Sequence, residues 1–404
     1  MIDTTEKALS PISLAASFLG FGILRYPLNQ PRYRLSIFYI LTVWSVYAYV
    51  LYYTTTYLFL KGVYTGLIAA FGVTVNLLTA ITSIIITICE YEKYRQYTRK
   101  LDLVDDTLEE LGIPKEYHKM RNLTRKALII WFLMICVTWT SDSLVCIGIF
   151  HDTRAIFLLF VMSYSMYVNS ITDITFILFL RHIGASLDKI NDHIKQLSET
   201  EDCGLRCKSK TFLVVNDYNV RNAKNRKHIL WIVIHLHLEL CRTARDINGF
   251  FGLQMTLQMI TYFVVLNGGS YFEYYTILHL KEINSNIILN TSLSSMIWFL
   301  VFLTKLISVN HICESVSAKA HKTKSIIHKL TNLICFAEAR EEIYQFVLQV
   351  SLRPLKFSGC GLFCFGYAFI RKFFVWTLTI VIFMAQMGFV PVWNEIDRKN
   401  TASI

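Results

Sequence analysis

The chain has 404 residues, of which 54% are hydrophobic and 17% are charged, and its formal net charge is +11. Soluble globular chains carry about 25% charged residues, and here the apolar residues gather in long blocks that are nearly free of charge. This pattern excludes a soluble globular protein and predicts a membrane protein. The basic residues lie between the apolar blocks rather than in one patch, so we expect no nucleic-acid partner.

Seven apolar blocks are long enough to cross a lipid bilayer, which requires about 20 residues of helix. The predicted spans are residues 35–60, 63–89, 127–150, 155–180, 247–266, 287–309 and 373–390. The segment before the first span contains acidic residues and lacks a basic leader, so we expect no secretory signal there. The sequence therefore predicts an all-α membrane protein with seven transmembrane helices.

Lys and Arg are distributed unequally between the two sides of the predicted membrane. If the N-terminus is cytoplasmic, the outer side carries only five of the 40 basic residues: Lys61, Arg154, Lys281, Arg398 and Lys399. Because cytoplasmic loops are enriched in Lys and Arg, this predicts a cytoplasmic N-terminus and an extracellular C-terminus. A seven-helix G-protein-coupled receptor has the opposite orientation and is the less favoured alternative.

The long segments between spans fall on the predicted cytoplasmic side and look helical. Apolar residues recur at helical spacing in residues 109–125, 186–197, 229–248 and 308–350. In contrast, residues 203–225 are polar and irregular, which predicts a flexible loop. Only Cys146 of the ten cysteines lies near the outer face, and this excludes an extracellular disulfide framework.

No catalytic motif is present: the chain lacks G-x-S-x-G, H-E-x-x-H and a P-loop. We therefore expect neither an enzyme nor a cofactor. Two C-x3-C pairs, Cys203 with Cys207 and Cys360 with Cys364, lack the further ligands that a metal site needs. A secondary transporter would favour internal repeats and helices broken at mid-membrane, and neither is found.

The last predicted span carries a narrow polar stripe. Thr379 and Gln386 are seven residues apart, which is nearly two helical turns, so they share one face with Phe383 between them. Three or four copies of this helix around an axis would form a pore with a ring of Gln and a hydrophobic collar. The alternative is that Thr379 and Gln386 hydrogen-bond to a neighbouring helix within one subunit.

Two ionisable residues lie inside the predicted spans at similar depth from the inner boundary. They are Asp173 in the fourth span and Lys305 in the sixth. Ionisable groups at such depth usually face a cavity or a partner, so we hypothesise that these two form an ion pair. Independent contact of each residue with water is the alternative.

The outer halves of spans two to six are rich in side chains suited to a small-ligand site. The candidates are Tyr64, Trp139, Asp142, Tyr164, Tyr167, Gln258, Tyr262 and Trp298. Aromatic walls with a few hydrogen-bonding groups bind small polar organic molecules. Each of these residues, taken alone, is more often a packing or interfacial residue.

Several stretches resemble the insect gustatory receptor family. The last span of that family carries Thr-Tyr, five apolar residues and Gln-Phe; here Thr379-Ile380 and Gln386-Met387 keep the Thr and the Gln and replace the Tyr and the Phe. The family's Gly-Leu-Phe element before the last span is matched at residues 361–363. Residues 235–254 resemble the family's approach to the fifth span.

This resemblance implies a ligand-gated, nonselective cation channel, a homotetramer or heterotetramer in the plasma membrane of a chemosensory cell. Gln386 would form the constriction, Met387 would occupy the position of the motif Phe, and Thr379 would lie lower in the pore wall. A pocket among spans two to six would open outward and bind a small-molecule tastant. An odorant receptor channel of the same architecture is the alternative.

The predicted spans and the resemblance together divide the chain into five regions. These are a cytoplasmic N-terminal segment (1–34), spans one to six with the ligand site (35–309), cytoplasmic anchor helices (310–364), the pore helix (365–390) and an extracellular tail (391–404).

Overall fold

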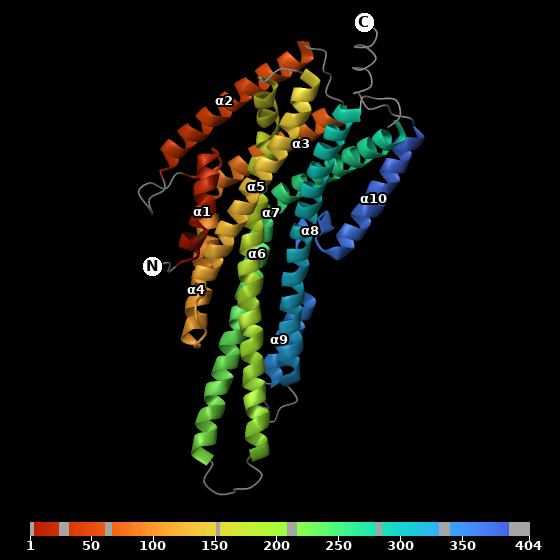
Figure 1. Ribbon diagram of the computed structural model, residues 1–404. Helices are drawn as coiled ribbons and strands as arrows, with labels where there is room; N and C mark the ends of the chain where they lie inside the picture. The colour runs from red at the N-terminus through yellow and green to blue at the C-terminus, as the bar shows by residue number, and fades with distance from the viewer. Residues whose placement is uncertain are drawn as a thin grey trace.

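The structure, a computed structural model, describes residues 4–23, 32–60, 67–150, 154–207, 216–279, 285–330 and 340–387. Its elements are α1 (Thr5–Phe18), α2 (Tyr33–Leu60), α3 (Leu67–Cys89), α4 (Tyr91–Glu110), α5 (Tyr117–Phe150), α6 (Arg154–Cys207), α7 (Asn216–His279), α8 (Ser285–Leu330), α9 (Arg340–Leu352), β1 (Ser358–Gly359), β2 (Phe363–Cys364) and α10 (Tyr367–Gln386) (Figure 1). Seven of the described helices, α2, α3, α5, α6, α7, α8 and α10, are long and apolar enough to cross a membrane. The predicted number and type of spans are confirmed, whereas the orientation of the termini stays a prediction.

The ends of the helices differ from two of the predictions. The predicted loop at 203–225 is wrong at both ends, because α6 reaches Cys207 and α7 already begins at Asn216; residues 208–215 between them lie outside the described residues. That segment contains no Pro, so nothing in it forces the two long helices to stop early. The predicted helix over 109–125 is interrupted instead: Gly112 has a φ of 85°, a left-handed conformation that ends α4.

Parts of some predictions lie outside the described residues. These are residues 1–3 and 24–31 of the N-terminal segment, the start of the second span at 63–66 with Tyr64, residues 208–215 of the predicted loop, residues 331–339 of the predicted 308–350 helix, the end of the last span at 388–390 and the tail at 391–404.

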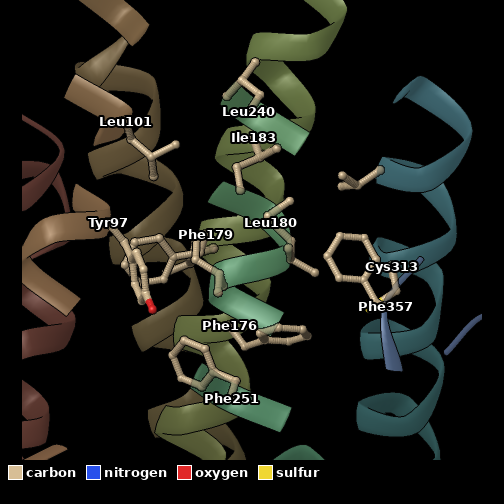
Figure 2. Packing of buried hydrophobic residues seen from close by; sticks show 14 of the residues in the cluster. Tyr97, Leu101, Phe176, Phe179, Leu180, Ile183, Leu240, Phe251, Cys313 and Phe357 are labelled. Carbon is tan, nitrogen blue, oxygen red and sulfur yellow. The ribbon is translucent and has the colours of Figure 1, made fainter. Parts of the chain in front are cut away.

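The helix α6 runs through the middle of the molecule, and α7 packs along it (Figure 1). These two are the most buried of the seven spans, while α5 and α10 are the least buried. Below the middle of Figure 1, α6 and α7 extend together past the other helices. Figure 2 shows how Phe176 and Phe179 of α6 meet Phe251 of α7, with ring centroids 5.5 and 6.4 Å apart. This cluster holds the two longest helices against each other.

The hairpin between α9 and α10 is a local departure from the all-α pattern. Ser358 pairs with Cys364 and Gly359 with Phe363, and the turn places Cys360 and Gly361 in the left-handed region. A Cβ atom on Gly359 would lie 2.7 Å from both the Phe363 ring and the Thr256 hydroxyl of α7. A glycine is therefore required where the hairpin packs against α7.

The short helix α1 is fastened to α4 through one buried carboxylate. The Thr5 backbone N–H donates to Asp102 Oδ1 at 2.7 Å, and the Tyr117 hydroxyl donates to the same oxygen at 3.3 Å. Leu9 and Ile12 of α1 are buried against the bundle. Burial raises the pKa of Asp102, and its hydrogen bonds with Thr5 oppose that effect.

Inside the bundle, α6, α7 and α8 meet at a buried ion pair. Lys305 Nζ lies 3.9 Å from Asp173 Oδ2, and both side chains are largely inaccessible. The Tyr262 hydroxyl donates to the same carboxylate oxygen at 2.6 Å, and Lys305 also donates to the Ser170 hydroxyl. The predicted pairing of Asp173 with Lys305 is therefore found in the structure. With no water to solvate them, such charges need partners of this kind.

Substitutions at Asp102 test how α1 is held. Asp102→Asn keeps an acceptor for the Thr5 N–H and the Tyr117 hydroxyl. We therefore expect its melting temperature at neutral pH to be close to that of wild type. Asp102→Ala leaves the two donors unpaired and is expected to lose about 2 kcal/mol of stability. The measurement is thermal unfolding of purified receptor, and equal melting of the two variants would contradict the account.

The stability difference between wild type and Asp102→Asn should depend on pH. Because burial raises the pKa of Asp102 in the folded protein, the folded state binds a proton more readily than the unfolded chain. This group therefore stabilises the fold as pH falls through its raised pKa and loses that contribution above it. Wild type should gain stability on acidification relative to Asp102→Asn.

The ion pair makes a second prediction. Lys305→Met strands the Asp173 charge in the interior, and we expect a loss of about 3–5 kcal/mol that abolishes surface expression. The double variant Asp173→Asn/Lys305→Met removes both charges and keeps an acceptor for Tyr262. It should restore surface expression, measured by labelling of intact cells. A double variant no better expressed than Lys305→Met would rule out the pairing.

Candidate ligand site and pore helix

Six aromatic side chains from α5, α6, α7 and α8 form one continuous row, here called the aromatic ladder. In order, its members are Trp139, Phe160, Tyr167, Trp298, Phe302 and Tyr262. Successive ring centroids are 6.2, 6.0, 6.3, 5.8 and 5.7 Å apart. Trp139 at one end is 42% exposed, whereas Tyr262 at the other is fully buried. The ladder therefore leads from the surface of the bundle to the Asp173–Lys305 pair.

Two rings in the middle of the aromatic ladder, Tyr167 and Trp298, form hydrogen bonds with polar side chains of α5. Asp142 of α5 accepts hydrogen bonds from Trp298 Nε1 at 3.0 Å and from the Ser294 hydroxyl at 2.6 Å, both on α8. One turn earlier on α5, the Thr138 hydroxyl lies 3.0 Å from the Tyr167 hydroxyl. Thr138 and Asp142 are four residues apart on α5, so they lie on one face of that helix. Through them α5 is joined to α6 at Tyr167 and to α8 at Ser294 and Trp298.

The aromatic ladder and its polar groups bring together five of the candidate ligand residues, Trp139, Asp142, Tyr167, Tyr262 and Trp298. Flat aromatic faces with a carboxylate and hydroxyl groups at their edges can hold a small organic molecule by stacking and by hydrogen bonding. Phe160, Phe302 and Ser294 also belong here and were missed by sequence reasoning. Ser294 could have been found, because it stands four residues before Trp298, whereas nothing distinguishes the two Phe residues from other apolar positions.

Two candidates lie elsewhere. The Tyr164 hydroxyl donates to the Leu19 carbonyl at 2.7 Å, and its ring lies against Trp44 and Tyr47. Gln258 is buried and donates to the Asn169 carbonyl at 3.2 Å. Their hydrogen bonds join α6 to the end of α1 and to α7. These two residues have roles in holding the helices together.

The helix α10 turns its polar stripe away from the rest of the subunit. Thr379, Phe383, Gln386 and Met387 are all exposed, whereas Phe373 near the start of α10 is buried. The Thr379 hydroxyl donates within its own helix, to the Val375 carbonyl at 2.9 Å. Figure 1 shows α10 leaning away from α8 over its upper part. The alternative in which Thr379 bonds to a neighbouring helix of the same subunit therefore finds no support here.

The first residues of α10 are tied to α8. The Gly366 backbone N–H donates to Asn310 Oδ1 at 2.9 Å, and the Tyr367 hydroxyl lies 2.6 Å from His311 Nδ1. Further along, the Phe373 ring packs on Phe263 of α7 with centroids 5.4 Å apart. The one helix α8 thus carries part of the aromatic ladder, a member of the buried ion pair and the attachment of α10.

Comparison with known proteins bears directly on this arrangement. A sequence profile of the family described as 7tm Chemosensory receptor matches residues 9–390. A Drosophila melanogaster protein provisionally named gustatory receptor 28b is 23% identical over 303 residues, which is 72% of this chain. The aligned part of this chain spans 62% of the length of that relative.

Two solved structures share the fold. The insect olfactory receptor OR5 from Machilis hrabei superposes with a TM-score of 0.59 at 13% identity, and the same receptor in complex with eugenol with a TM-score of 0.63 at 14% identity. Each comparison covers 95% of this chain and 98% of the other. The resemblance to insect chemoreceptors is therefore confirmed in both sequence and fold. Because the profile covers nearly the whole chain, the protein belongs to the 7tm chemosensory receptor family, which makes it a multi-pass receptor of the plasma membrane and not an enzyme.

Proposed function

We propose that this receptor is a ligand-gated, nonselective cation channel that opens when a small organic tastant binds. The observation that carries this proposal is the exposed face of α10. Gln386 presents its amide there without a protein partner among the described residues, within a span whose other exposed side chains are largely apolar. A polar side chain in a membrane needs a partner or water. Four such faces around an axis, as in a tetramer, would provide both.

The ligand site of the proposed channel is the aromatic ladder with Asp142. Its composition suits a small, partly apolar molecule that carries a hydroxyl group. The olfactory receptor from Machilis hrabei was solved in complex with eugenol, a molecule of this kind. The gustatory relative supports a tastant as ligand. An odorant as ligand of the same channel is the second candidate, favoured by the names of the two similar structures.

The helix α8 links the proposed ligand site to the proposed pore. Trp298 and Asn310 are 12 residues apart on it, a distance of about 18 Å along the axis. A ligand that separates Trp298 from Asp142 would alter the position of α8, and Asn310 would transmit that change to the start of α10. The ligand would thus favour the open state of a pre-existing equilibrium, in proportion to its preference for that state.

The proposed assembly is a homotetramer or a heterotetramer with a cytoplasmic N-terminus. Residues 310–364 would hold the subunits together on the cytoplasmic side, and residues 365–390 would line the pore. The helix α9 supports this division, because Tyr344, Leu348 and Leu352 leave an exposed apolar face on it. Such a face on a helix outside the membrane suits contact with another subunit.

Expression in a heterologous cell, with whole-cell recording during application of a tastant panel, tests the proposed function. A ligand-evoked cation current that persists when G proteins are inhibited would support the channel. A response that disappears with G-protein inhibition would overturn it.

Within that assay, Gln386→Ala tests the pore face. Removal of the amide ring is expected to change the relative permeability of cations or the current without ligand, because the constriction loses its polar lining. Met384→Leu is the matched control, since Met384 is half-buried on the opposite side of the same turn. Unchanged permeability and leak in a responding Gln386→Ala receptor would remove this residue from the pore.

Two substitutions at Trp298 test the ligand site. Trp298→Phe keeps an aromatic face and loses the hydrogen bond to Asp142, whereas Trp298→Leu loses both. We expect the ligand concentration for half-maximal current to rise by about tenfold in the first and further in the second. The control is Trp231→Phe, at an exposed residue of α7 that lies outside the aromatic ladder. A dose–response curve unmoved by either Trp298 variant would place the ligand elsewhere.

A further inference from the structure

A second site is suggested by a large cavity beside the start of α10. It has a volume of about 1050 Å³ and lies between α7, α8, the end of α9 and the hairpin region. Gly366 and Ala368, at the first turn of the last span, form part of its wall. In the orientation proposed above, this position is level with the headgroups of the cytoplasmic leaflet. We call it the basic cavity, because Arg and Lys side chains form part of its wall.

Four basic side chains, three Arg and one Lys, line the basic cavity. Arg242 and Arg245 come from α7, and Arg353 and Lys356 follow α9. Arg245 donates to the neutral carbonyl of Arg353 at 3.1 Å. In the part of the chain that the structure describes, the ion pairs of the protein involve other residues, so no carboxylate neutralises these four charges directly.

Two carboxylates also line the basic cavity, Glu239 and Glu314. Glu314 lies at the N-terminus of α10, where its Oε2 atom occupies the position that a Cβ of Gly366 would take. The positive end of the helix dipole partly offsets its charge there. The wall therefore keeps an excess of positive charge over negative.

One further wall residue has an unmet hydrogen bond. The His237 side chain is fully buried, and its Nε2 atom lies 3.5 Å from Cys241 Sγ. Its Nδ1 atom has no partner among the residues that the structure describes, and it is shielded from the space inside the cavity. His237 therefore supports the cavity wall, and the exposed Arg and Lys side chains are the groups that can contact a bound anion.

We propose that the basic cavity binds a phosphate-rich anion, the headgroup of a phosphorylated lipid of the cytoplasmic leaflet. Arg guanidinium groups bind phosphate with paired hydrogen bonds, and basic pockets between membrane helices on the cytoplasmic side hold such headgroups. A soluble polyphosphate presents the same chemistry and is the other source of the anion. Because residues at the start of α10 form part of the wall, occupancy regulates opening of the channel, and this consequence rests on the proposed function.

The experiment measures binding rather than current, so it stands even if the receptor does not conduct. Full-length receptor in phosphatidylcholine nanodiscs is titrated with a fluorescent short-chain phosphatidylinositol bisphosphate, and separately with inorganic triphosphate as competitor. We expect saturable binding of the lipid. The variant Arg242→Gln/Arg353→Gln should bind about 25-fold more weakly, at about fivefold for each charge.

The matched control is Lys322→Gln/Lys324→Gln, which removes two charges from α8 outside the wall of the basic cavity. It should bind within about twofold of wild type, because nearby charges in water are screened. Lys356→Gln, at an exposed loop residue, gives a milder second test if the double variant fails to fold, and about fivefold weaker binding is expected.

The outcomes separate the two sources of phosphate. If triphosphate displaces the lipid only when it is in large excess, the cavity binds a lipid headgroup. If triphosphate binds more tightly than the lipid does, the cavity binds a soluble anion. Both results support a phosphate site. Absence of saturable binding, or equal losses in the cavity variant and the matched control, would overturn the proposal.

Discussion

Inside a membrane, a polar side chain must find a partner, because water is absent and lipid offers none, and this requirement decides how the helices of the receptor meet. Apolar contacts alone give little preference between helices in lipid, so polar contacts and close packing decide which helices meet. The Asp173–Lys305 pair, with Tyr262 donating to the same carboxylate, fixes α6, α7 and α8 at one depth. Nearer the start of α8, Asp142 with Trp298 and Ser294 joins α5 to α8 in the same way.

The same constraint explains why α10 differs from the other spans. Its start is held by Asn310 and packed through Phe373, and beyond that point its polar stripe is exposed among the residues that the structure describes. Thr379 satisfies its hydroxyl within the helix, whereas the Gln386 amide has no hydrogen-bond partner among the described residues. In the proposed tetramer, copies of α10 around a common axis would supply contacts for this face. The exposed face of α10 is the observation on which the proposed channel rests.

The sequence predicted those features that depend on local spacing. Seven residues between Thr379 and Gln386 put them on one face, and similar depth in two spans brought Asp173 and Lys305 together as a hypothesis. Rotation about each helix axis is set by tertiary packing, so similar depth does not bring Tyr164 and Gln258 beside Trp298. Phe160 and Phe302 carry no signal in an apolar span. The hairpin near Gly359 was missed because two-residue strands are too short for an alternating pattern.

The most direct test of the central claim is the accessibility of position 386 in an open receptor. Gln386→Cys would be expressed and exposed to a small, charged, membrane-impermeant thiol reagent during ligand-evoked current, with wild type as control for the native cysteines. The account predicts that the reagent blocks the current of the variant and leaves wild type unaffected, with faster block when ligand is present. A cysteine at 386 that the reagent never modifies, in a receptor that still conducts, would contradict it.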